Sequence, residues 1–319
     1  MYFTYEQPDF DVNDPGEIRR VIEEAYTNGR ESTYAGAVAD YIPELAKAPR
    51  DDFGLCVRSM TGETIAFGET EKRFSIQSIS KVISLAAALK FLGFRETFSH
   101  VMMEPSGDAF NSILKLDTAS DLPFNPMINA GAIQVMSMLS GIMDFDGLLD
   151  FARAFCMDED IVLNEAVYRS ETETGDRNRA IVWLLKSKGV LQGEPEKTLD
   201  LYFRMCSLNV NAKSLANMGL LIASGGQNPF TGKHVIHPGY VRTIRSLMFT
   251  CGLYDESGEY GVLVGIPSKS GVGGGIAASV ARRWGIGTYG PALNAKGNSI
   301  GGVAALQHMS HLLRLNVFE

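Results

Sequence analysis

The hydrophobic pattern separates the chain into strand-like ends and a helical middle. Two short apolar runs separated by a Thr-Gly pair predict a β-hairpin over residues 53–67. After residue 252 the residue pattern changes to runs rich in β-branched and small residues. These runs predict three more strands, over 260–266, 274–281 and 284–289.

Apolar residues spaced three and four apart predict helices in most of the remaining chain. The first opens with Asp14 as N-cap and Pro15 at the first helical position, and the last spans about 302–315. Strands at both ends and helices between them favour an α+β fold, with one antiparallel sheet and an inserted helical lobe. The helices predicted in the middle cover 78–93, 128–139, 145–155, 176–188, 196–208, 212–223 and 238–248.

We therefore expect a single domain over 1–319. Its sheet lobe would comprise approximately 1–77 and 253–319, and its helical lobe approximately 78–252. No repeat, low-complexity tract or linker interrupts this pattern. A cleft between the two lobes is the default place for a functional site.

Composition and charge narrow the possible partners. The 319 residues are 45% hydrophobic and 21% charged, with a formal net charge of −8, which is typical of a globular protein. An acidic balance without a basic run argues against nucleic acid and against an anionic membrane surface. Two long uncharged stretches, 122–143 and 214–232, contain several amides, so we expect them to be buried and not to span a membrane.

Cysteine and histidine positions indicate neither disulfides nor a metal. The four cysteines form no C-x-x-C pair and lie in apolar surroundings, which predicts reduced, buried thiols. His308 and His311 are three apart, but no further ligand follows them, so we expect no metal site. The first residues show no secretory signal, so we expect a cytoplasmic protein.

Ser78 and Lys81 form an S-x-x-K at the head of an apolar helix. Positions i and i+3 share a helix face, so the hydroxyl and the amine can meet. A serine becomes nucleophilic when a neighbouring base takes its proton, and burial depresses the pKa of a lysine. The pair predicts acyl transfer, although the same tetrapeptide occurs in many helices that have no catalytic role.

Lys269, Ser270 and Gly271 supply a second motif, at the end of the predicted 260–266 strand. In S-x-x-K acyl-transfer enzymes a K-[TS]-G triad lies on a strand beside the active site. An early S-x-x-K helix followed by a late K-S-G strand fits that arrangement. The alternative interpretation is a Gly-rich hairpin turn.

Seven segments together resemble the bacterial glutaminases of the glutaminase A family. They run collinearly over about 35 to 275 and are jointly far more specific than S-x-x-K alone. Members of this family are related in fold to the serine β-lactamases, which agrees with the predicted sheet and helical insert. The segments are VADYIPELA (38–46), FSIQSISK (74–81), EPSG (104–107), NPMINAGA (125–132), SETETGDRN (170–178), CGLYD (251–255) and KSGVGGG (269–275).

The resemblance implies a single catalytic glutaminase domain that hydrolyses L-glutamine to L-glutamate and ammonia with water and without a cofactor. It also implies a homo-oligomer, a dimer or a tetramer. Ser78 would be the nucleophile and Lys81 its base, with Tyr254 and Tyr41 close to the reacting centre. The residues implied for the substrate pocket are Ser78, Asn129, Glu171, Asn178, Tyr202, Tyr254 and the backbone of Val272.

The chemistry of free glutamine suits these residue types. Glu171 offers a negative charge to the α-ammonium, and Asn129 and Asn178 offer both donors and acceptors, which suits a carboxylate beside an amine. The backbone N–H groups of Ser78 and Val272 would hold the oxyanion. Taken alone, Glu171 could equally be a solvated loop acid and the asparagines turn residues.

Tyr202, Tyr254 and Tyr41 could each be ordinary packing residues if the resemblance is set aside. Within it, Tyr202 adds a rigid wall with a hydroxyl, and Tyr254 is the candidate base for the second step, deacylation. We expect a neighbouring lysine ammonium to favour the ionised form of Tyr254. Tyr41 is the next candidate for that role.

Two alternatives remain open on the sequence alone. A β-lactamase or a penicillin-binding transpeptidase would share the S-x-x-K, but a signal peptide and a clear S-D-N are missing. An amino-acid-binding sensor on the same scaffold would have no need of both Ser78 and Lys81.

Overall fold

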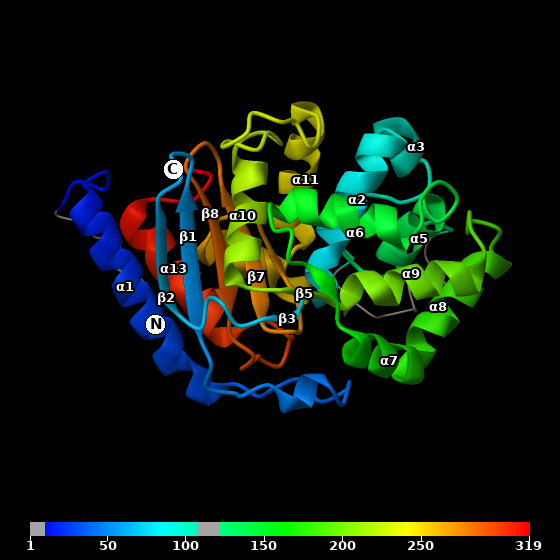
Figure 1. Cartoon of the computed structure of the whole chain (residues 1–319), viewed down its shortest axis with the longest axis horizontal. Helices are drawn as coiled ribbons and strands as arrows, with labels where there is room; N and C mark the ends of the chain where they lie inside the picture. Colours follow the sequence, from blue (N-terminus) through cyan, green and yellow to red (C-terminus); the bar gives the residue numbers. More distant parts are fainter. Residues whose placement is uncertain (1–9, 107–120) are drawn as a thin grey trace.

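The computed structural model describes residues 10–106 and 121–319. A β-sheet and its covering helices form one half of the molecule, and a cluster of helices forms the other (Figure 1). Helix α1 (Pro15–Ser32) and the last helix, α13 (Ile300–Leu313), pack against each other beside the sheet. The Asp14 side chain caps α1 by accepting from the Glu17 N–H at 2.9 Å, as the sequence predicts.

The main sheet has five antiparallel strands in the order β2-β1-β8-β7-β6. Gly54 is paired with Gly68 on one side and with Tyr289 on the other, so the N-terminal hairpin joins the C-terminal strands directly. The prediction of one antiparallel sheet built from both chain ends is confirmed. The strands are β1 (Gly54–Ser59), β2 (Thr64–Gly68), β6 (Ser268–Ser270), β7 (Gly275–Val280) and β8 (Trp284–Tyr289).

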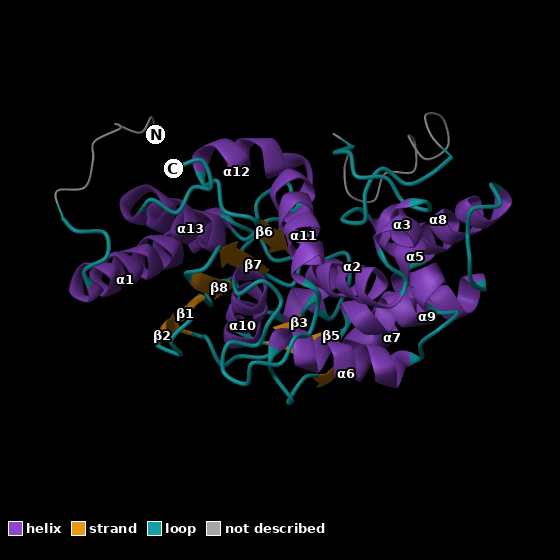
Figure 2. Ribbon diagram, turned by 90° about the horizontal axis from the view of Figure 1, so that it is seen from above, coloured by secondary structure: helices purple, strands orange, loops and turns teal. Residues whose placement is uncertain are grey.

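Successive side chains of β7 enter different cores because they point to opposite faces of the sheet. Ile276 and Ala278 belong to the core formed with α1 and α13, whereas Ala277 belongs to the core that continues into the helical half. Helices therefore cover both faces of the sheet (Figure 2). This double coverage explains why the C-terminal strands read as nearly continuous small and apolar residues.

Helix α10 (Ala212–Ala223) covers the second face, where it packs on β7 and β8. It comes from the middle segment of the chain, which was predicted as the helical lobe. The backbones approach so closely that a Cβ at Gly287 would lie 2.0 Å from the carbonyl oxygen of Ala212. Glycine in β8 thus allows α10 to connect the sheet to the remaining helices.

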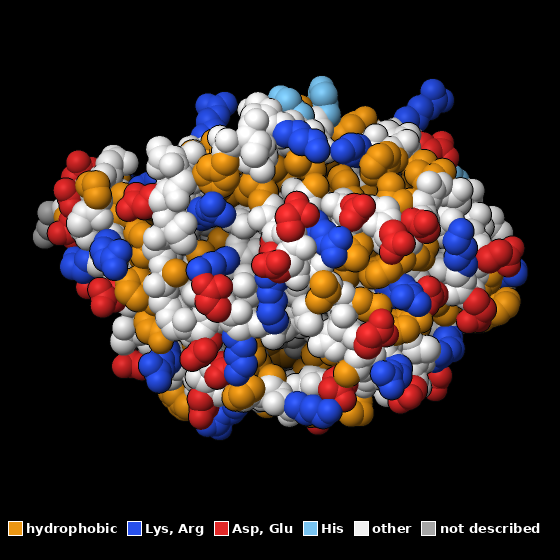
Figure 3. Space-filling model, viewed as in Figure 1, with side chains coloured by type: hydrophobic (Ala, Val, Ile, Leu, Met, Phe, Trp, Pro, Cys, Tyr) orange, Lys and Arg blue, Asp and Glu red, His pale blue; other side chains and the backbone are white. Residues whose placement is uncertain are grey.

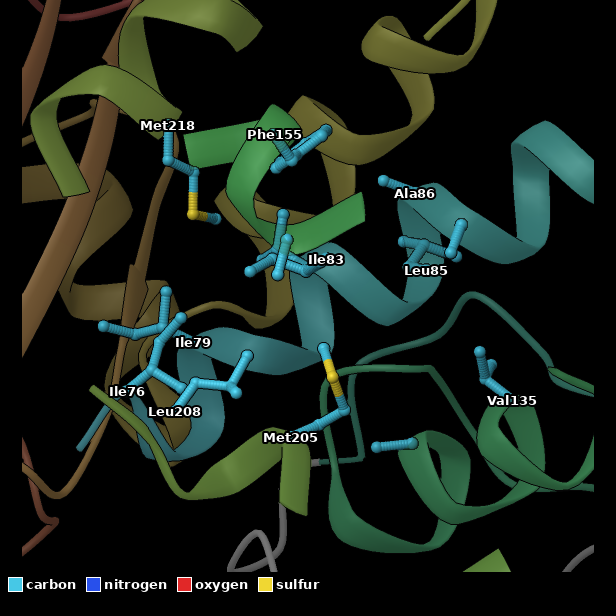
Figure 4. Close-up of a cluster of buried hydrophobic side chains, with 14 of the residues drawn as sticks. Ile76, Ile79, Ile83, Leu85, Ala86, Val135, Phe155, Met205, Leu208 and Met218 are labelled. Carbon is cyan, nitrogen blue, oxygen red and sulfur yellow. The ribbon is translucent and has the colours of Figure 1, made fainter. Parts of the chain in front are cut away.

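The helical half surrounds α2 (Ser80–Phe91), whose first ten residues are all buried. Side chains from several helices converge with it on one apolar core (Figure 4). This core fixes the position of the S-x-x-K segment at the start of α2. Among the described residues, the other helices of this half are α3 (Phe94–Phe98), α5 (Asn129–Leu139), α6 (Phe145–Cys156), α7 (Glu165–Thr174), α8 (Asp176–Ser187), α9 (Pro195–Cys206) and α11 (Pro238–Cys251).

The strand predicted over 260–266 is wrong, because helix α12 (Ser257–Leu263) occupies most of it. Tyr260 and Val264 are buried, four residues apart, whereas Val262 between them is 78% exposed. That is the spacing of one helix face. The β-branched residues misled the prediction, and the K-S-G motif instead lies on its own short strand, β6.

Helix α7 and a small second sheet were not predicted. The sequence of α7, EAVYRSETET, lacks a broad apolar stripe, but the Asn164 side chain caps it by accepting from the backbone N–H groups of Ala166 and Val167. The predicted helix 196–208 ends earlier, because its last residues leave α9 to join the small sheet. That sheet has the order β3-β5-β4, with β3 (Phe74–Ser75), β5 (Leu208–Val210) and β4 (Val162–Leu163).

The surface carries interspersed acidic and basic side chains on the face drawn in Figure 3. All four cysteines are buried and free, as the sequence predicts. Within residues 10–106 and 121–319, no helix has the length and apolar character needed to cross a membrane. In the same ranges, no three His, Cys, Asp or Glu side chains are grouped so that they could hold a metal ion.

Candidate active site

Ser78 lies in a sharp turn between β3 and α2. Gln77 adopts a φ of +51°, a left-handed conformation that is uncommon for residues other than glycine. The turn continues as a 3₁₀ helix, Gln77–Ile79, and the Ser80 hydroxyl closes it by donating to the Gln77 carbonyl at 2.7 Å. Ser78 is only 7% exposed, so its hydroxyl meets few groups besides those that the fold places around it.

Lys81 meets Ser78 as the i, i+3 spacing predicts. Its Nζ donates to the Ser78 Oγ at 2.9 Å and to the Asn129 Oδ1 at 2.7 Å. The side chain is 1% exposed, and burial lowers the pKa of Lys81 to about 8. A lysine with this pKa has a neutral fraction near physiological pH that grows as the pH rises through 8, and the neutral amine can accept a proton from a hydroxyl.

A cavity of about 380 Å³ opens in front of Ser78. A larger, mostly apolar cavity of about 580 Å³ lies between α11 and the β7–β8 turn, but none of the predicted site residues lines it. The smaller cavity is therefore the candidate site. Residues predicted for the site line it from separate segments of the chain: Tyr41, Ser78, Asn129, Glu171, Asn178 and Tyr202.

Glu171 is a buried residue of α7, which excludes the interpretation as a solvated loop acid. It is 7% exposed and accepts a hydrogen bond from the Gln77 side chain. Burial raises the pKa of Glu171 to about 7, and this effect outweighs the hydrogen bond from Gln77 and the charge of Lys81. A positively charged ligand would restore the ionised form of this carboxyl group.

The two asparagines form one continuous array with the lysine. Asn129 accepts from Lys81 through Oδ1 and donates through Nδ2 to the Asn178 Oδ1 at 3.0 Å. Because the Oδ1 of Asn129 is occupied by the lysine, the polar groups that remain for a ligand lie mainly on the Asn178 side. The array links the nucleophile to the far wall of the cavity.

The two tyrosines of the cavity differ in exposure. Tyr202, on α9, is 5% exposed, and burial raises the pKa of its hydroxyl well above the usual value. Tyr41 is 52% exposed at the cavity mouth, yet its hydroxyl is desolvated, and this desolvation together with the nearby Glu171 raises its pKa as well. Both side chains therefore remain neutral hydrogen-bonding walls.

Tyr254 stands behind Ser78 and does not line this cavity. Its hydroxyl contacts the Ser78 hydroxyl and the backbone N–H of Val272. Burial raises the pKa of Tyr254 despite these two contacts, so the expectation that a nearby lysine favours its ionised form is wrong. The free-energy cost of desolvating a phenolate inside the fold exceeds the stabilisation that its hydrogen bonds provide.

The K-S-G strand lies directly behind Tyr254. Lys269 is fully buried, donates to the carbonyl oxygens of Gly252 at 2.9 Å and Ser270 at 2.6 Å, and lies 4.5 Å from the centroid of the Tyr254 ring. Burial, reinforced by the charge of Lys81, holds the pKa of Lys269 well below its usual value.

The glycines after Lys269 allow this strand to touch the nucleophile turn. A Cβ at Gly271 would lie 2.8 Å from the Ile76 carbonyl oxygen and 3.4 Å from the Ser78 nitrogen. A Cβ at Gly273 would lie 2.3 Å from the Ser75 carbonyl oxygen. The interpretation of the motif as a mere hairpin turn is therefore insufficient, because the segment packs against the nucleophile turn.

The sequence reasoning missed several residues of the cavity wall. Gln77 is the most informative, because it bonds to Glu171 and its Nε2 also lies 3.3 Å from the Ser75 Oγ. Its position directly before the nucleophile was the available signal. The other wall residues that were missed are Ile42, Thr174, Gly175, Arg177 and Cys206.

These features define a class of protein. A Ser-Lys pair at the head of a buried helix, a K-S-G strand beside it and a five-stranded antiparallel sheet covered by helices are the features of the β-lactamase-like serine acyl-transfer fold. Comparison with known proteins assigns the chain within this class. The family model described as Glutaminase matches residues 36–318, and the chain belongs to the glutaminase family.

Individual relatives agree with the family assignment. The chain is 47% identical over 305 residues to glutaminase 2 of Clostridium perfringens, covering 94% of this chain and 100% of that one. A solved probable glutaminase superposes with a TM-score of 0.91 at 35% identity, covering 96% of this chain and 99% of the other. A Bacillus subtilis glutaminase, solved as a covalent complex with 5-oxo-L-norleucine, has a TM-score of 0.85, 35% identity and coverage of 96% and 100%.

The family assignment decides between the alternatives that the sequence left open. The chain is a glutaminase, an enzyme that hydrolyses L-glutamine to L-glutamate and ammonia, and it is neither a β-lactamase nor a binding sensor. The fold expected from the resemblance is confirmed by the solved glutaminases.

Proposed function

We propose that this glutaminase works through a glutamyl-enzyme formed on Ser78. Neutral Lys81 takes the hydroxyl proton, and the Ser78 Oγ attacks the side-chain amide carbon of glutamine. The C–N bond breaks as the protonated lysine returns the proton to the leaving ammonia. A water molecule then hydrolyses the ester and releases glutamate. The observation that carries this proposal is the 2.9 Å contact between Ser78 and a lysine whose pKa is about 8.

The covalent step has support from a relative. The Bacillus subtilis glutaminase complex was formed by reaction of that protein with 6-diazo-5-oxo-L-norleucine. In this chain, the same reagent should add one 5-oxo-norleucine mass to the intact protein, on the peptide containing Ser78. Ammonia release from glutamine, asparagine and other amides, measured in parallel, tests the substrate. Labelling elsewhere, or hydrolysis of every amide except glutamine, would contradict the proposal.

The oxyanion of the tetrahedral intermediate would lie between the N–H groups of Ser78 and Val272. The K-S-G strand and the nucleophile turn are in contact, so these two peptide groups belong to abutting segments. The Val272 N–H donates to the Tyr254 hydroxyl. The developing oxyanion would compete for this donor.

We propose that Glu171 holds the α-ammonium of glutamine, while Asn129 and Asn178 hold the α-carboxylate. Tyr202 and Tyr41 would close the sides of the pocket. This assignment is supported by the burial of Glu171 on the wall of the cavity that also contains the two asparagines. A buried carboxylate favours a cationic partner, and the charge of Lys81 does not offset the burial of Glu171.

Glu171→Gln should weaken glutamine binding by about 2–3 kcal/mol, because the neutral amide keeps the shape and removes the charge. In the wild type, kcat/KM should fall as the pH drops below about 7, since Glu171 then becomes protonated and loses its attraction for the ammonium. The variant should lose the fall that Glu171 causes and keep only the fall that protonation of Lys81 causes below about pH 8. Initial rates across pH 5.5–9, with both enzymes, measure the difference.

The matched control is Glu173→Gln, on the same helix but exposed. It should leave KM and the pH profile unchanged. N-acetyl-glutamine, which lacks the ammonium, should be a poor substrate for the wild type. Efficient hydrolysis of this blocked amide would rule out the proposed role of Glu171.

We propose that Tyr254 acts as a neutral proton relay beside Ser78, since burial keeps its hydroxyl protonated. Tyr254→Phe keeps the ring and removes the hydroxyl, so kcat should fall by about 10²-fold while KM changes little. Intact mass after mixing with glutamine would show a glutamyl adduct if deacylation has become slow. A raised KM with unchanged kcat would make Tyr254 only a wall residue, and Tyr41 would be tested next.

We further propose a cytoplasmic homo-oligomer, a dimer or a tetramer. The location is supported by four buried, free cysteines, which are typical of proteins in reducing compartments. The oligomer is supported by the resemblance to the bacterial glutaminases. Light scattering on the purified protein tests the assembly state.

A further inference from the structure

Tyr254 has an unusual backbone conformation for a residue that contacts the nucleophile. Its φ is +55°, and it begins a short 3₁₀ turn, Tyr254–Glu256, two residues beyond the end of α11. A bulky residue in the left-handed region persists only where the surrounding structure holds it there. The groups that hold this turn therefore determine where the Tyr254 hydroxyl lies.

A buried asparagine and a carboxylate hold the turn from one side. The Asn298 Nδ2 donates to the Leu253 carbonyl at 3.3 Å and to the Glu256 Oε2 at 2.5 Å, and Asn298 is fully buried. The Glu256 carboxylate also accepts from the Asn294 Nδ2, at 2.9 and 3.2 Å. These bonds tie the residues on both sides of Tyr254 to one loop, 294–298, near the C-terminus.

The same loop also touches the Tyr254 ring. Gly297 has a φ of +89°, and a Cβ there would lie 3.6 Å from the ring and 3.4 Å from the Val272 side chain. The loop is itself closed by the Asn294 N–H, which donates to the Asn298 carbonyl at 2.8 Å. Loop 294–298 thus packs on Tyr254 and holds its backbone through Glu256 and Asn298.

We propose that Glu256 and Asn298 are positioning residues for the reaction, which hold the Tyr254 hydroxyl against Ser78. Neither residue lines the cavity in front of Ser78. Their hydrogen bonds hold the turn that carries Tyr254, so their removal should lower kcat and leave substrate binding in place. This inference rests on the proposed role of the Tyr254 hydroxyl.

Glu256→Ala removes the acceptor shared by the two asparagines. It should lower kcat between about 10- and 100-fold, the scale of a misplaced catalytic group, with KM within about twofold of wild type. Glu256→Gln keeps one acceptor oxygen and should recover part of the loss. Asn298→Asp replaces the donor with an acidic oxygen that faces the Glu256 carboxylate, so it should lower kcat at least as much as Glu256→Ala. The matched control Glu259→Gln, an exposed neighbour on α12, should retain wild-type activity.

A double-variant cycle separates positioning from general damage to the fold. In a Tyr254→Phe background the hydroxyl is absent, so adding Glu256→Ala should cost less than about twofold in kcat. Thermal unfolding of every variant accompanies the rates. If Glu256→Ala lowers kcat as much in the Tyr254→Phe background as in the wild type, the positioning role is overturned. If Tyr254→Phe alone changes nothing, the proposed role of Tyr254 fails instead, and the two failures are distinguishable.

Discussion

Ser78→Ala should lose nearly all glutaminase turnover, by about 10⁴-fold or more, while the protein remains folded. The substitution removes the attacking oxygen, and what is left is substrate binding together with the oxyanion donors. Because Ser78 lies behind the cavity at 7% exposure, the alanine fits without a new clash or a large void. Single-turnover ammonia release at high enzyme concentration measures the residual rate.

The matched control for this loss is Ser84→Ala, in the adjoining helix α2. The Ser84 hydroxyl is also buried, but it donates to the Ser80 carbonyl of its own helix, at 3.2 Å. This variant should retain wild-type turnover. If Ser78→Ala keeps one tenth of the wild-type kcat, Ser78 is not the nucleophile. Loss of labelling by 6-diazo-5-oxo-L-norleucine should accompany loss of turnover.

Lys81→Ala should lose about 10³- to 10⁴-fold in kcat, since Ser78 then has no adjacent base. Wild-type kcat/KM should rise with pH through about 8, because the raised pH removes the proton from Lys81 and leaves the neutral base. The rise of kcat/KM through about pH 8 should be absent in Lys81→Ala. Rates from pH 6.5 to 9.5 measure it, together with thermal unfolding to monitor the fold.

Lys81→Arg should fail as severely, because a guanidinium keeps its proton near neutral pH and cannot serve as a base. Lys90→Arg, at the exposed end of the same helix, provides the control for a lysine-to-arginine exchange and should be active. A Lys81→Arg enzyme with substantial activity at pH 7 would show that another group deprotonates Ser78, and Tyr254 would then have to be reconsidered.

Much of the fold was predictable from the sequence because the relevant signals are local. The Thr-Gly hairpin between β1 and β2, the Asp14 cap and the apolar spacing of α2 each specify an element from a few neighbouring residues. The prediction of a strand over 260–266 was wrong because there the local signal and the tertiary packing disagree. Its β-branched residues resemble a strand locally, but burial of Tyr260 and Val264 against the core selects a helix.

By itself, the sequence determined the pairing of Ser78 with Lys81, since a 3₁₀ turn that continues into α2 brings positions i and i+3 together. It also determined the family, through collinear segments. Only the tertiary structure decided the ionisation of the site. Burial of Glu171 and Tyr254 raises the pKa of both, because the desolvation of a charge depends on every element packed around it. Segments distant in sequence, such as loop 294–298 on Tyr254, create that environment, and no local pattern encodes it.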